Sequence, residues 1–345
     1  MSLFPKVGRN QPRLKIAWWL LTAFLCLGVL LHLFPFYYML VLSITPARET
    51  LSTTPTLWPE SPTLAAWRLV FDVATRSSTN QAARDLMKYP LSVYIGNSLF
   101  MVFTALALSL PITAFAAYAN SKLQRGPIAR WSFLFFIGTL MVPGVVTLIP
   151  SFLLTRNFPF ALPNPPLIPG TNTPFPVLRI WDTPWAVILP AVFSAFNFLL
   201  FKGFFDTIPD SIIQAARVDG GSEFNIFRRI VFPMSIPVFA VAAWLQFSGL
   251  WDAYLWPIVV FQSPEKIPAS VAIVNLMNAF TRAGSTNADQ AALMSQDPQM
   301  REILEAGLSW NGLMVLGILQ TLPIFIMFII CREYLMKGIR IRGLK

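Results

Sequence analysis

Long apolar runs alternate with polar stretches along this chain of 345 residues. An α-helix needs about 20 apolar residues to cross the roughly 30 Å hydrocarbon core of a bilayer. Six runs approach or exceed this length, at residues 16–42, 93–119, 131–154, 185–201, 230–261 and 311–331. The pattern therefore predicts an all-α integral membrane protein with about six transmembrane helices.

The first run follows a basic start and so resembles a secretory signal peptide. Lys6, Arg9, Arg13 and Lys15 precede it. The run is much longer than the apolar core of a signal peptide, which spans about 7–15 residues, and no small-residue cleavage pattern follows it. We therefore expect an uncleaved membrane anchor.

The composition agrees with a chain that is solvated by lipid. Hydrophobic residues make up 55% of it and charged residues only 12%, about half the charged share of a soluble domain. The net charge of +10 would suit a nucleic-acid-binding protein, but the basic residues lie beside the apolar runs and form no basic domain. We therefore expect membrane lipid, and no nucleic acid, as a partner.

The placement of charge predicts the topology. With the N-terminus inside, the inner segments are residues 1–15, 120–130, 202–229 and 332–345, and they hold 16 of the 26 lysines and arginines. The outer loops are much longer yet hold only the remaining ten. Positive residues concentrate in short cytoplasmic loops, so we expect a multi-pass plasma-membrane protein with both termini in the cytoplasm.

Few residues suit catalysis or metal binding. Cys26 and Cys331 lie within or at the end of apolar runs, and they are too few for a metal site or a disulfide framework. His32 is the single histidine, and a proton relay would require intramembrane partners. We predict no metal site. A membrane-embedded enzyme is disfavoured, because it would gather acidic or histidine clusters at a membrane face.

Two outer loops stand out by composition. The loop at residues 156–184 contains eight prolines, which favour an extended and irregular backbone. It is either a linker or a surface for an external partner. In the later loop, Pro298 suits the first turn of a short helix at residues 297–306.

The inner loop at residues 206–233 has the pattern of two short helices around a glycine hinge. Ser211 and Gln214 form a Ser-x-x-Gln capping box at the first helix. Gly220 ends that helix, because glycine adopts positive φ at little cost. Ser222 is placed to cap the second helix.

The second helix of this loop carries an aromatic stripe. Phe224, Phe227 and Ile230 recur at three-residue spacing and so share one face. Such a stripe suits the apolar groove of a partner protein. It also suits lipid or the chain's own bundle, and the spacing does not decide between these.

The same loop resembles the cytoplasmic motif of permease subunits of ABC importers: Glu-Ala-Ala, three residues, Gly, nine residues, Ile, one residue, Leu-Pro. The matching positions here are Gln214-Ala215-Ala216, Gly220, Ile230 and Phe232-Pro233. Phe232 is a hydrophobic exchange for leucine. Gln214 replaces the family's acid and lacks the charge for a salt bridge to the ATPase.

Other segments carry the same resemblance. They are residues 94–99, 116–118 and 141–143, the segment Trp251-Asp-Ala-Tyr-Leu-Trp-Pro257, and the basic tail at residues 332–343. The likeness is closest to the second permease subunit of maltose-type transporters. It implies a type I ABC importer permease fold, with an N-terminal tail, first helix and outer loop at residues 1–90 and a core permease domain at residues 91–345.

The resemblance implies the permease subunit of an ATP-driven importer in a bacterial or archaeal plasma membrane. Its solute would be a sugar, an oligosaccharide or a sugar-like osmolyte, delivered by an extracytoplasmic solute-binding protein. A second permease subunit and two ATP-binding subunits, which hold ATP and Mg²⁺, would complete the transporter.

This chain itself is expected to be no enzyme and to hold no cofactor. It contains no Gly-Lys pair and so lacks the usual phosphate loop for ATP. A phosphorylated polyol is an alternative solute for the importer. A stand-alone channel is an alternative function, although it would leave the inner-loop motif unexplained.

The resemblance assigns contact with the ATPase to Gln214, Ala215, Ala216, Asp219, Gly220, Phe224, Phe227, Ile230 and Pro233. Candidates for the solute pathway are Trp251, Asp252 and Tyr254. Asp252 is the one acid inside an apolar run, and a charge within a membrane is costly and often functional. A position in an aromatic belt at the outer end of the fifth helix would also explain these three residues.

Overall fold

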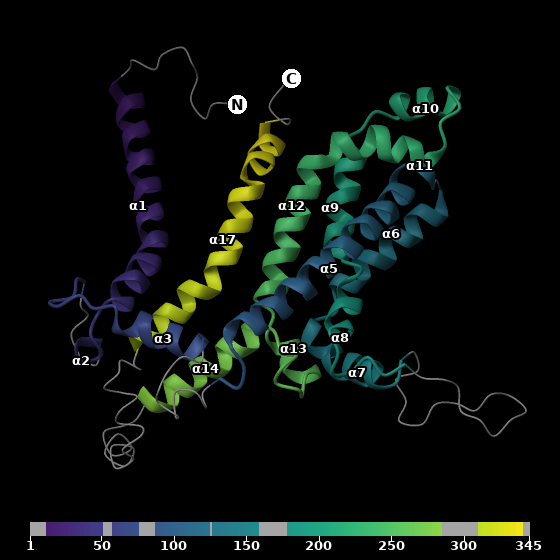
Figure 1. The fold of residues 1–345 in the computed structure, drawn as a ribbon. Coiled ribbons are helices and arrows are strands. Elements are labelled where there is room, and N and C mark those ends of the chain that lie inside the picture. Colours follow the sequence, from purple (N-terminus) through teal and green to yellow (C-terminus); the bar gives the residue numbers. More distant parts are fainter. Residues whose placement is uncertain are drawn as a thin grey trace, which may run out of the picture. The chain divides into compact units, whose positions relative to one another are not determined.

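The protein is helical throughout the part of the chain that the structure describes. The structure is a computed structural model, and it describes residues 12–50, 57–75, 87–124, 126–158, 178–284 and 310–340 (Figure 1). These ranges contain one isolated β-bridge, between Phe158 and Leu178. The proline-rich segment at 159–177 and the short helix expected at 297–306 lie outside the described residues.

Five described helical segments are long and apolar enough to cross a membrane, and a bent helix pair raises the number to six if it counts as one span. The five segments are Leu14–Ser43, Leu91–Leu123, Trp185–Phe205, Glu223–Trp251 and Trp310–Met336. The prediction of an all-α membrane protein with about six spans is therefore confirmed.

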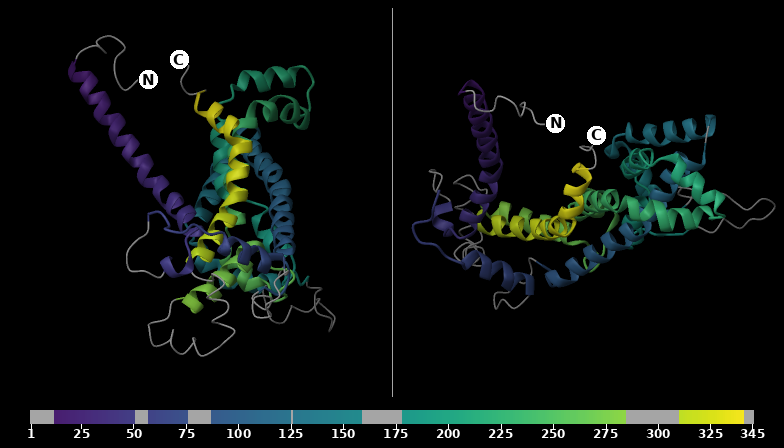
Figure 2. Two further views of the ribbon diagram at one scale, coloured as in Figure 1. Left: turned by 60° about the vertical axis from the view of Figure 1, so that its left-hand side comes forward. Right: turned by 90° about the horizontal axis from the view of Figure 1, so that it is seen from above.

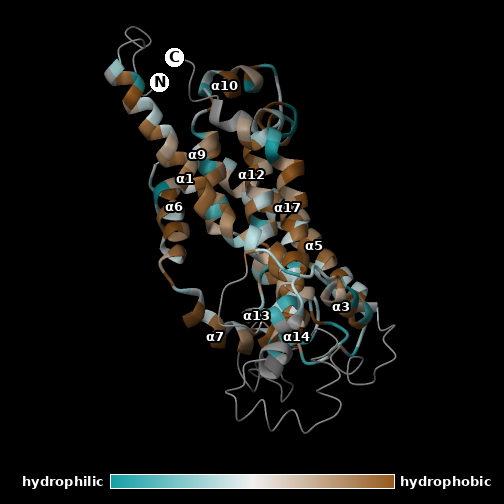
Figure 3. Ribbon diagram, turned by 90° about the vertical axis from the view of Figure 1, so that its left-hand side faces the viewer, coloured by the Kyte–Doolittle hydropathy of each residue, from teal (hydrophilic) through white to brown (hydrophobic). Residues whose placement is uncertain are grey.

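Several elements make up these spans. They are α1 (Pro12–Ser43), α5 (Leu91–Tyr118) with the π-helical turn η1 (Ala119–Leu123), α8 (Trp185–Ile188) with η2 (Leu189–Ala191) and α9 (Ala195–Phe205), α12 (Phe232–Trp251), and α17 (Trp310–Arg340). The spanning helices α5, α9 and α12 are mostly hydrophobic along their length (Figure 3). Shorter helices lie between the spans: α2 (Ala47–Thr50), α3 (Ala65–Thr75), α13 (Leu255–Val260) and α14 (Ala269–Gly284).

Not every apolar run is a single helix, which corrects the sequence-based expectation. The run at residues 131–154 consists of α6 (Pro127–Leu140) and α7 (Gly144–Arg156), which meet at an angle of 99°. Pro143 precedes α7 with an extended backbone, φ −60° and ψ 132°. Proline has no N–H to continue a helix, and it disfavours helical backbone in the residue before it. The run at residues 230–261 likewise stops at Trp251 and resumes in α13.

The described chain divides into two compact units. The first unit includes α1, α2, α3 and the start of α17. Within it, Trp67 Nε1 donates to Ser43 Oγ at 3.2 Å, and Asn311 Nδ2 donates to the Thr45 carbonyl at 3.1 Å. These bonds satisfy polar groups where α1 ends.

The second unit, residues 88–274 and 322–344, contains the main core. Phe198, Phe201 and Phe205 of α9 are fully buried. They pack in one cluster with Ala114 and Ala117 of α5, whose small side chains let the two helices approach closely. In Figure 1 and the left view of Figure 2, α10 and α11 lie at one end of α9 and α12, while α7 and α13 lie at the other end.

A buried polar cluster joins the helices of the second unit in their middle. Gln246 of α12 accepts from Asn197 Nδ2 at 2.8 Å and from Ser109 Oγ at 3.2 Å, and its Nε2 donates to the Ala191 carbonyl at 3.1 Å. One side chain therefore links α5, α9, η2 and α12. Polar side chains at membrane depth need such partners, because lipid offers none.

We expect Gln246→Leu to destabilise the second unit, because it leaves Asn197 and Ser109 without their acceptor. The loss should be about 1–2 kcal/mol, the upper range for interhelical hydrogen bonds in membranes. Thermal or denaturant unfolding of the purified protein in detergent measures it. Gln262→Leu is the matched control, since the Gln262 side chain is exposed, and an equal loss in both variants would contradict the assigned role.

Candidate functional site

The inner loop folds as a compact helical hairpin, as its sequence predicts. Helix α10 (Asp210–Val218) and helix α11 (Glu223–Ile226) flank a tight turn, and the π-helical turn η3 (Phe227–Val231) leads from α11 into α12. We call residues 210–226 the α10–α11 hairpin. The glycine expected at the hinge, Gly220, has φ +79°, which is the left-handed backbone that glycine adopts without strain.

The turn is a Schellman motif. The Gly220 N–H donates to the Arg217 carbonyl and the Gly221 N–H donates to the Ala216 carbonyl, both at 3.0 Å, which satisfies the last carbonyls of α10. A Cβ on Gly221 would lie 2.8 Å from the Ala216 carbonyl oxygen. Both glycines are therefore required for the close return of the chain.

One of the two predicted helix caps is present. Ser222 Oγ accepts from the Asn225 N–H at 3.4 Å and caps α11. The capping box of Ser211 and Gln214 is wrong, because α10 begins at Asp210 after the extended residue Pro209. Ser211 then lies inside the first turn and cannot serve as the cap.

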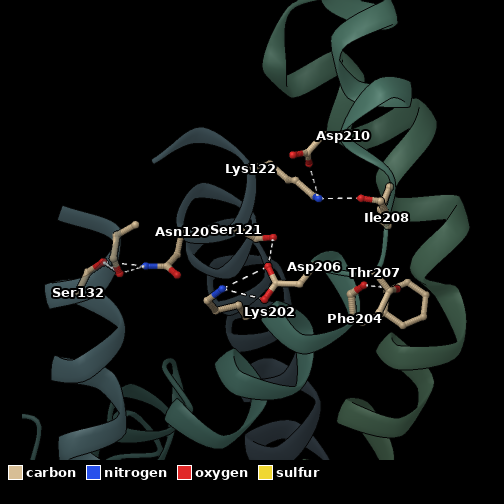
Figure 4. Close-up of polar contacts among 11 residues, drawn as sticks. Asn120, Ser121, Lys122, Ser132, Lys202, Phe204, Asp206, Thr207, Ile208 and Asp210 are labelled. Carbon is tan, nitrogen blue, oxygen red and sulfur yellow. Dashed lines mark hydrogen bonds and ion pairs between the residues drawn. The ribbon is translucent and has the colours of Figure 1, made fainter. Parts of the chain in front are cut away.

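Charged side chains fix the start of the hairpin to the end of α5. Lys122 Nζ donates to Asp210 Oδ1 at 2.8 Å and to the Ile208 carbonyl at 2.7 Å. The Lys122 side chain is only 6% exposed. Beside it, Asp206 Oδ1 accepts from Ser121 Oγ at 2.6 Å, and Asp206 Oδ2 pairs with Lys202 Nζ at 2.8 Å (Figure 4). The segment that enters α10 is thus held at several points.

A second group of polar contacts closes the hairpin and binds it to α5. Arg217 Nε donates to Glu223 Oε1 at 2.7 Å, which joins α10 to α11 across the glycine turn. Tyr118 Oη donates to Glu223 Oε2 at 2.8 Å. Arg217 Nη2 also donates to the Lys122 carbonyl at 3.3 Å. The hairpin therefore has a fixed orientation on the end of the bundle.

Our sequence reasoning did not find these contacts. Arg217 and Glu223 are an opposite-charge pair that brackets a predicted turn, and that signal was available in the sequence. The partners Tyr118 and Lys122 lie about a hundred residues earlier, so only the folded chain brings them to the hairpin.

The predicted aromatic stripe is divided between the bundle and the surface. Phe227 is only 6% exposed and its ring lies 4.4 Å from Phe115 and 5.4 Å from Tyr118, measured between centroids. Phe224 remains 60% exposed. Phe224 also lies against Phe115, with ring centroids 6.1 Å apart, so both rings contact α5 and Phe224 alone of the two keeps a large exposed surface.

The surface that the hairpin leaves open is mixed apolar and polar. Val218 is 87% exposed at the end of α10, close in sequence to the exposed Gln214, Ala215 and Asp219. Ile213 is buried on the opposite side of α10 in the main core cluster. One face of the hairpin therefore anchors it, and the other presents apolar side chains away from the bundle.

The three residues predicted for the solute pathway lie in two different environments. Trp251 is 2% exposed and its ring stacks on Phe247, with centroids 5.9 Å apart, so it belongs to the core. Asp252 and Tyr254 are exposed and line a cavity of about 510 Å³ between α7, α12 and α13. Ser151 and Trp256 also line it. Two of the helices that line it, α7 and α13, lie at the end of the second unit opposite α10 and α11 (Figure 1).

No group of three or more histidine, cysteine, aspartate or glutamate side chains gathers to hold a metal ion within the described ranges. Several polar groups near the hairpin pair with one another, and its exposed residues are apolar or neutral apart from Asp210 and Asp219. The arrangement suits docking and movement of a helical element.

A helical membrane bundle with an anchored hairpin at one end and a cavity at the other defines a membrane-embedded transport component. Comparison with known families agrees. The chain belongs to the family of binding-protein-dependent transport system inner membrane components, whose family model matches residues 100–341. It is therefore a permease subunit of the carbohydrate-importer type that the loop motif indicates.

Characterised relatives match nearly the whole chain. A polygalacturonan/rhamnogalacturonan transport system permease protein of Bacillus subtilis is 24% identical over 94% of this chain and 97% of its own length. An arabinooligosaccharides transport system permease protein of Halalkalibacterium halodurans is 24% identical over 95% and 96%. An sn-glycerol-3-phosphate transport system permease protein of Yersinia enterocolitica is 24% identical over 91% and 93%.

A solved structure shows the same fold. A chain of a bacterial ABC transporter involved in the import of the acidic polysaccharide alginate superposes with a TM-score of 0.64. The match covers 94% of this chain and 99% of that chain, at 20% sequence identity. The fold prediction of an ABC importer permease is thereby confirmed.

We expect the Tyr118–Glu223 bond to stabilise the hairpin on α5. Tyr118→Phe should lower the free energy of unfolding by about 1 kcal/mol in the wild-type chain, as for one hydrogen bond to a partly exposed charged group. In a Glu223→Ala background it should lower that free energy by almost nothing. Unfolding of the four proteins in detergent gives this double-mutant cycle. Equal costs in both backgrounds would show that the two side chains do not interact.

Proposed function

We propose that this chain is the permease subunit of an ATP-driven importer that takes up a sugar, an oligosaccharide or a sugar-like osmolyte. The observation that carries the proposal is the anchored hairpin at the position of the ABC-importer loop motif, in a chain of that transport family. Relatives named for polygalacturonan, rhamnogalacturonan and arabinooligosaccharides favour a carbohydrate solute.

The partners follow from this function. The chain pairs with a second permease subunit, two ATP-binding subunits hydrolyse ATP with Mg²⁺, and an extracytoplasmic solute-binding protein delivers the solute. The exposed apolar residues of the hairpin, Val218 and Phe224, support contact with an ATPase groove. Gln214, Ala215, Ala216, Asp219 and Gly220 belong to the same contact. Phe227, Ile230 and Pro233 hold the hairpin at the start of α12.

The hairpin acts as a rigid coupling element. Closure of the ATPase dimer displaces it, and its ties to Lys122 and Tyr118 pass that displacement to α5. Helices α5, α9 and α12, joined through Gln246, then change between inward- and outward-facing arrangements. Packed helices switch between such discrete states more readily than they deform continuously.

We infer a topology with both termini and the hairpin in the cytoplasm. The short segments that carry most of the lysines and arginines, including Lys122, Lys202 and Arg217, then face inward, as the positive-inside rule requires. The cavity lined by Asp252 and Tyr254 then faces the outer side. We assign this cavity to the solute pathway, and its aromatic and hydroxyl-bearing lining suits a sugar.

A phosphorylated polyol is the alternative solute. A relative named for sn-glycerol-3-phosphate transport shares the same degree of identity as the saccharide relatives. The two solutes differ in charge, so competition between neutral and anionic solutes for uptake separates them.

We expect Val218→Asp to weaken docking of the ATPase at least tenfold, because it places a charge in an apolar contact. Pull-down of tagged full-length chain in mild detergent, with quantification of each recovered subunit, measures this. The second permease should still be recovered. Val218→Ile, which keeps the site apolar, is the matched control.

Full recovery of an ATPase with Val218→Asp would show that the ATPase contact does not include the end of α10. Failure of the wild-type chain to recover any ATPase, under conditions that preserve known transporter complexes, would reject the importer function itself.

A further inference from the structure

A second, smaller cavity lies at the end of the second unit opposite the hairpin. It measures about 260 Å³, and its described lining consists of Leu153, Arg156, Asn157, Arg179 and Trp181. These residues come from the end of α7 and from the segment before α8. The proposed topology makes this the outer face.

Two guanidinium groups line this cavity without an acidic partner. No ion pair joins Arg156 or Arg179 to a carboxylate within the described ranges of the chain. Asp182 is the acid nearest in sequence, but its oxygens accept from Ser263 and Gln262 and pair with Lys266 Nζ at 3.1 Å. The positive charge of the cavity is therefore not neutralised by Asp182.

The Trp181 ring lies beside Arg156 in the same lining. Its indole Nε1 is buried, and within the described ranges it has no hydrogen-bond partner. The Arg156 guanidinium lies 5.5 Å from the Trp181 ring centroid and 6.0 Å from that of Phe152. These ring contacts hold Arg156 in place while leaving N–H groups at its edge for a ligand.

The backbone around the cavity is well tied. The N–H groups of Ile180 and Trp181 both donate to the Thr155 carbonyl at 3.0 Å. Phe158 and Leu178 exchange backbone bonds of 3.2 and 3.0 Å. The segment from residue 178 to 181 is thus fixed against the end of α7, which brings Arg179 and Trp181 to Arg156.

The Asp182 carboxylate fixes the same segment to the residues that follow α13. Asp182 is a non-glycine residue with φ +56°, and its carboxylate bonds span to the segment after α13. Burial raises the pKa of this carboxyl, but the hydrogen bonds from Ser263, Gln262 and Lys266 outweigh that effect and hold the pKa below its usual range. The carboxylate therefore remains charged, and keeps these hydrogen bonds, at any physiological pH.

We propose that Arg156 and Arg179, beside the Trp181 ring, form an oxyanion-binding site that takes the acid group of an anionic sugar or polyol. The acid group is a carboxylate or a phosphate monoester, both of which guanidinium groups bind with paired N–H donors. The inference rests on the proposed import function and narrows its solute to an anionic one.

A purely structural role accounts for only part of this site. Arg156 lies in the last turn of α7, where a cation complements the helix dipole. Arg179 lies outside any helix and contacts no carboxylate in the described chain. The cavity volume is slightly below the 300–1,000 Å³ of pockets for drug-sized ligands, which suits one sugar unit.

The test uses the full-length chain in the complex that it recovers, reconstituted in nanodiscs and labelled with 5-fluorotryptophan. The ¹⁹F signal of Trp181 is assigned by its loss in Trp181→Phe. The probes are galacturonate, glycerol 3-phosphate, galactose and inorganic phosphate, each titrated separately. We expect galacturonate or glycerol 3-phosphate to shift the Trp181 signal with saturation, and galactose to leave it unchanged.

Variants separate binding from folding. Arg179→Gln should weaken binding of the organic anion at least tenfold, and Arg179→Lys should restore part of it. Arg130→Gln, which removes an exposed arginine at the hairpin end of the bundle, should have no effect. Tighter binding of galacturonate would indicate a carboxylate ligand, and tighter binding of glycerol 3-phosphate would indicate a phosphate ester.

Three outcomes would overturn the proposal: no anion shifts the signal, galactose shifts it equally, or inorganic phosphate binds as tightly as the organic anions and marks an adventitious ion only. If an ATPase is still recovered with the chain in those cases, the import function stands and only the anionic solute fails. If no ATPase is recovered, the proposed function fails with it.

Discussion

The proposed coupling mechanism depends on one interaction above all, the attachment of the α10–α11 hairpin to the end of α5. Lys122 and Tyr118 belong to adjacent turns of α5 and η1, and they bind Asp210 and Glu223 at the two ends of the hairpin. A hairpin held by one contact would pivot when pushed. Two contacts on one helix, together with the buried Phe227, make the hairpin move with α5.

The two ends of the second unit then have different tasks. At the hairpin end, Lys122 and Arg217 pair with carboxylates within the chain, and the exposed residues Val218 and Phe224 are apolar. At the opposite end, Arg156 and Arg179 line a cavity and form no ion pair within the described residues. Internal pairing suits a part that docks through apolar contact, whereas unpaired charge suits a part that receives a polar solute.

Much of the fold is encoded locally and was predictable. Long apolar runs predict spans because lipid accepts few other structures, and the hinge at Gly220 follows from the backbone freedom of glycine. The 99° bend at Pro143 was harder to foresee, because proline inside a membrane helix often causes only a kink. The π-helical turn at Phe227–Val231 leaves no local signal in the sequence. The burial of Phe227 depends on Phe115 and Tyr118 of α5, which lie far away in the sequence.

The sites required contacts between distant segments. Tyr118 meets Glu223, and Arg156 meets Trp181, only after the helices pack. Sequence reasoning could predict the helical hairpin because its motif is continuous over 20 residues. It could not separate Trp251, a core residue, from Asp252 and Tyr254, which line a cavity, because the three are close neighbours in sequence and differ only in direction.

The central claim is that the α10–α11 hairpin contacts the ATPase. Incorporation of a photo-crosslinking amino acid at Val218, compared with Tyr254 at the opposite end, tests it most directly in membranes that contain the whole transporter. The account predicts an ATP-binding subunit crosslinked at Val218 and not at Tyr254. Crosslinking of that subunit at Tyr254, or at neither position while the assembled transporter is recovered, would contradict it.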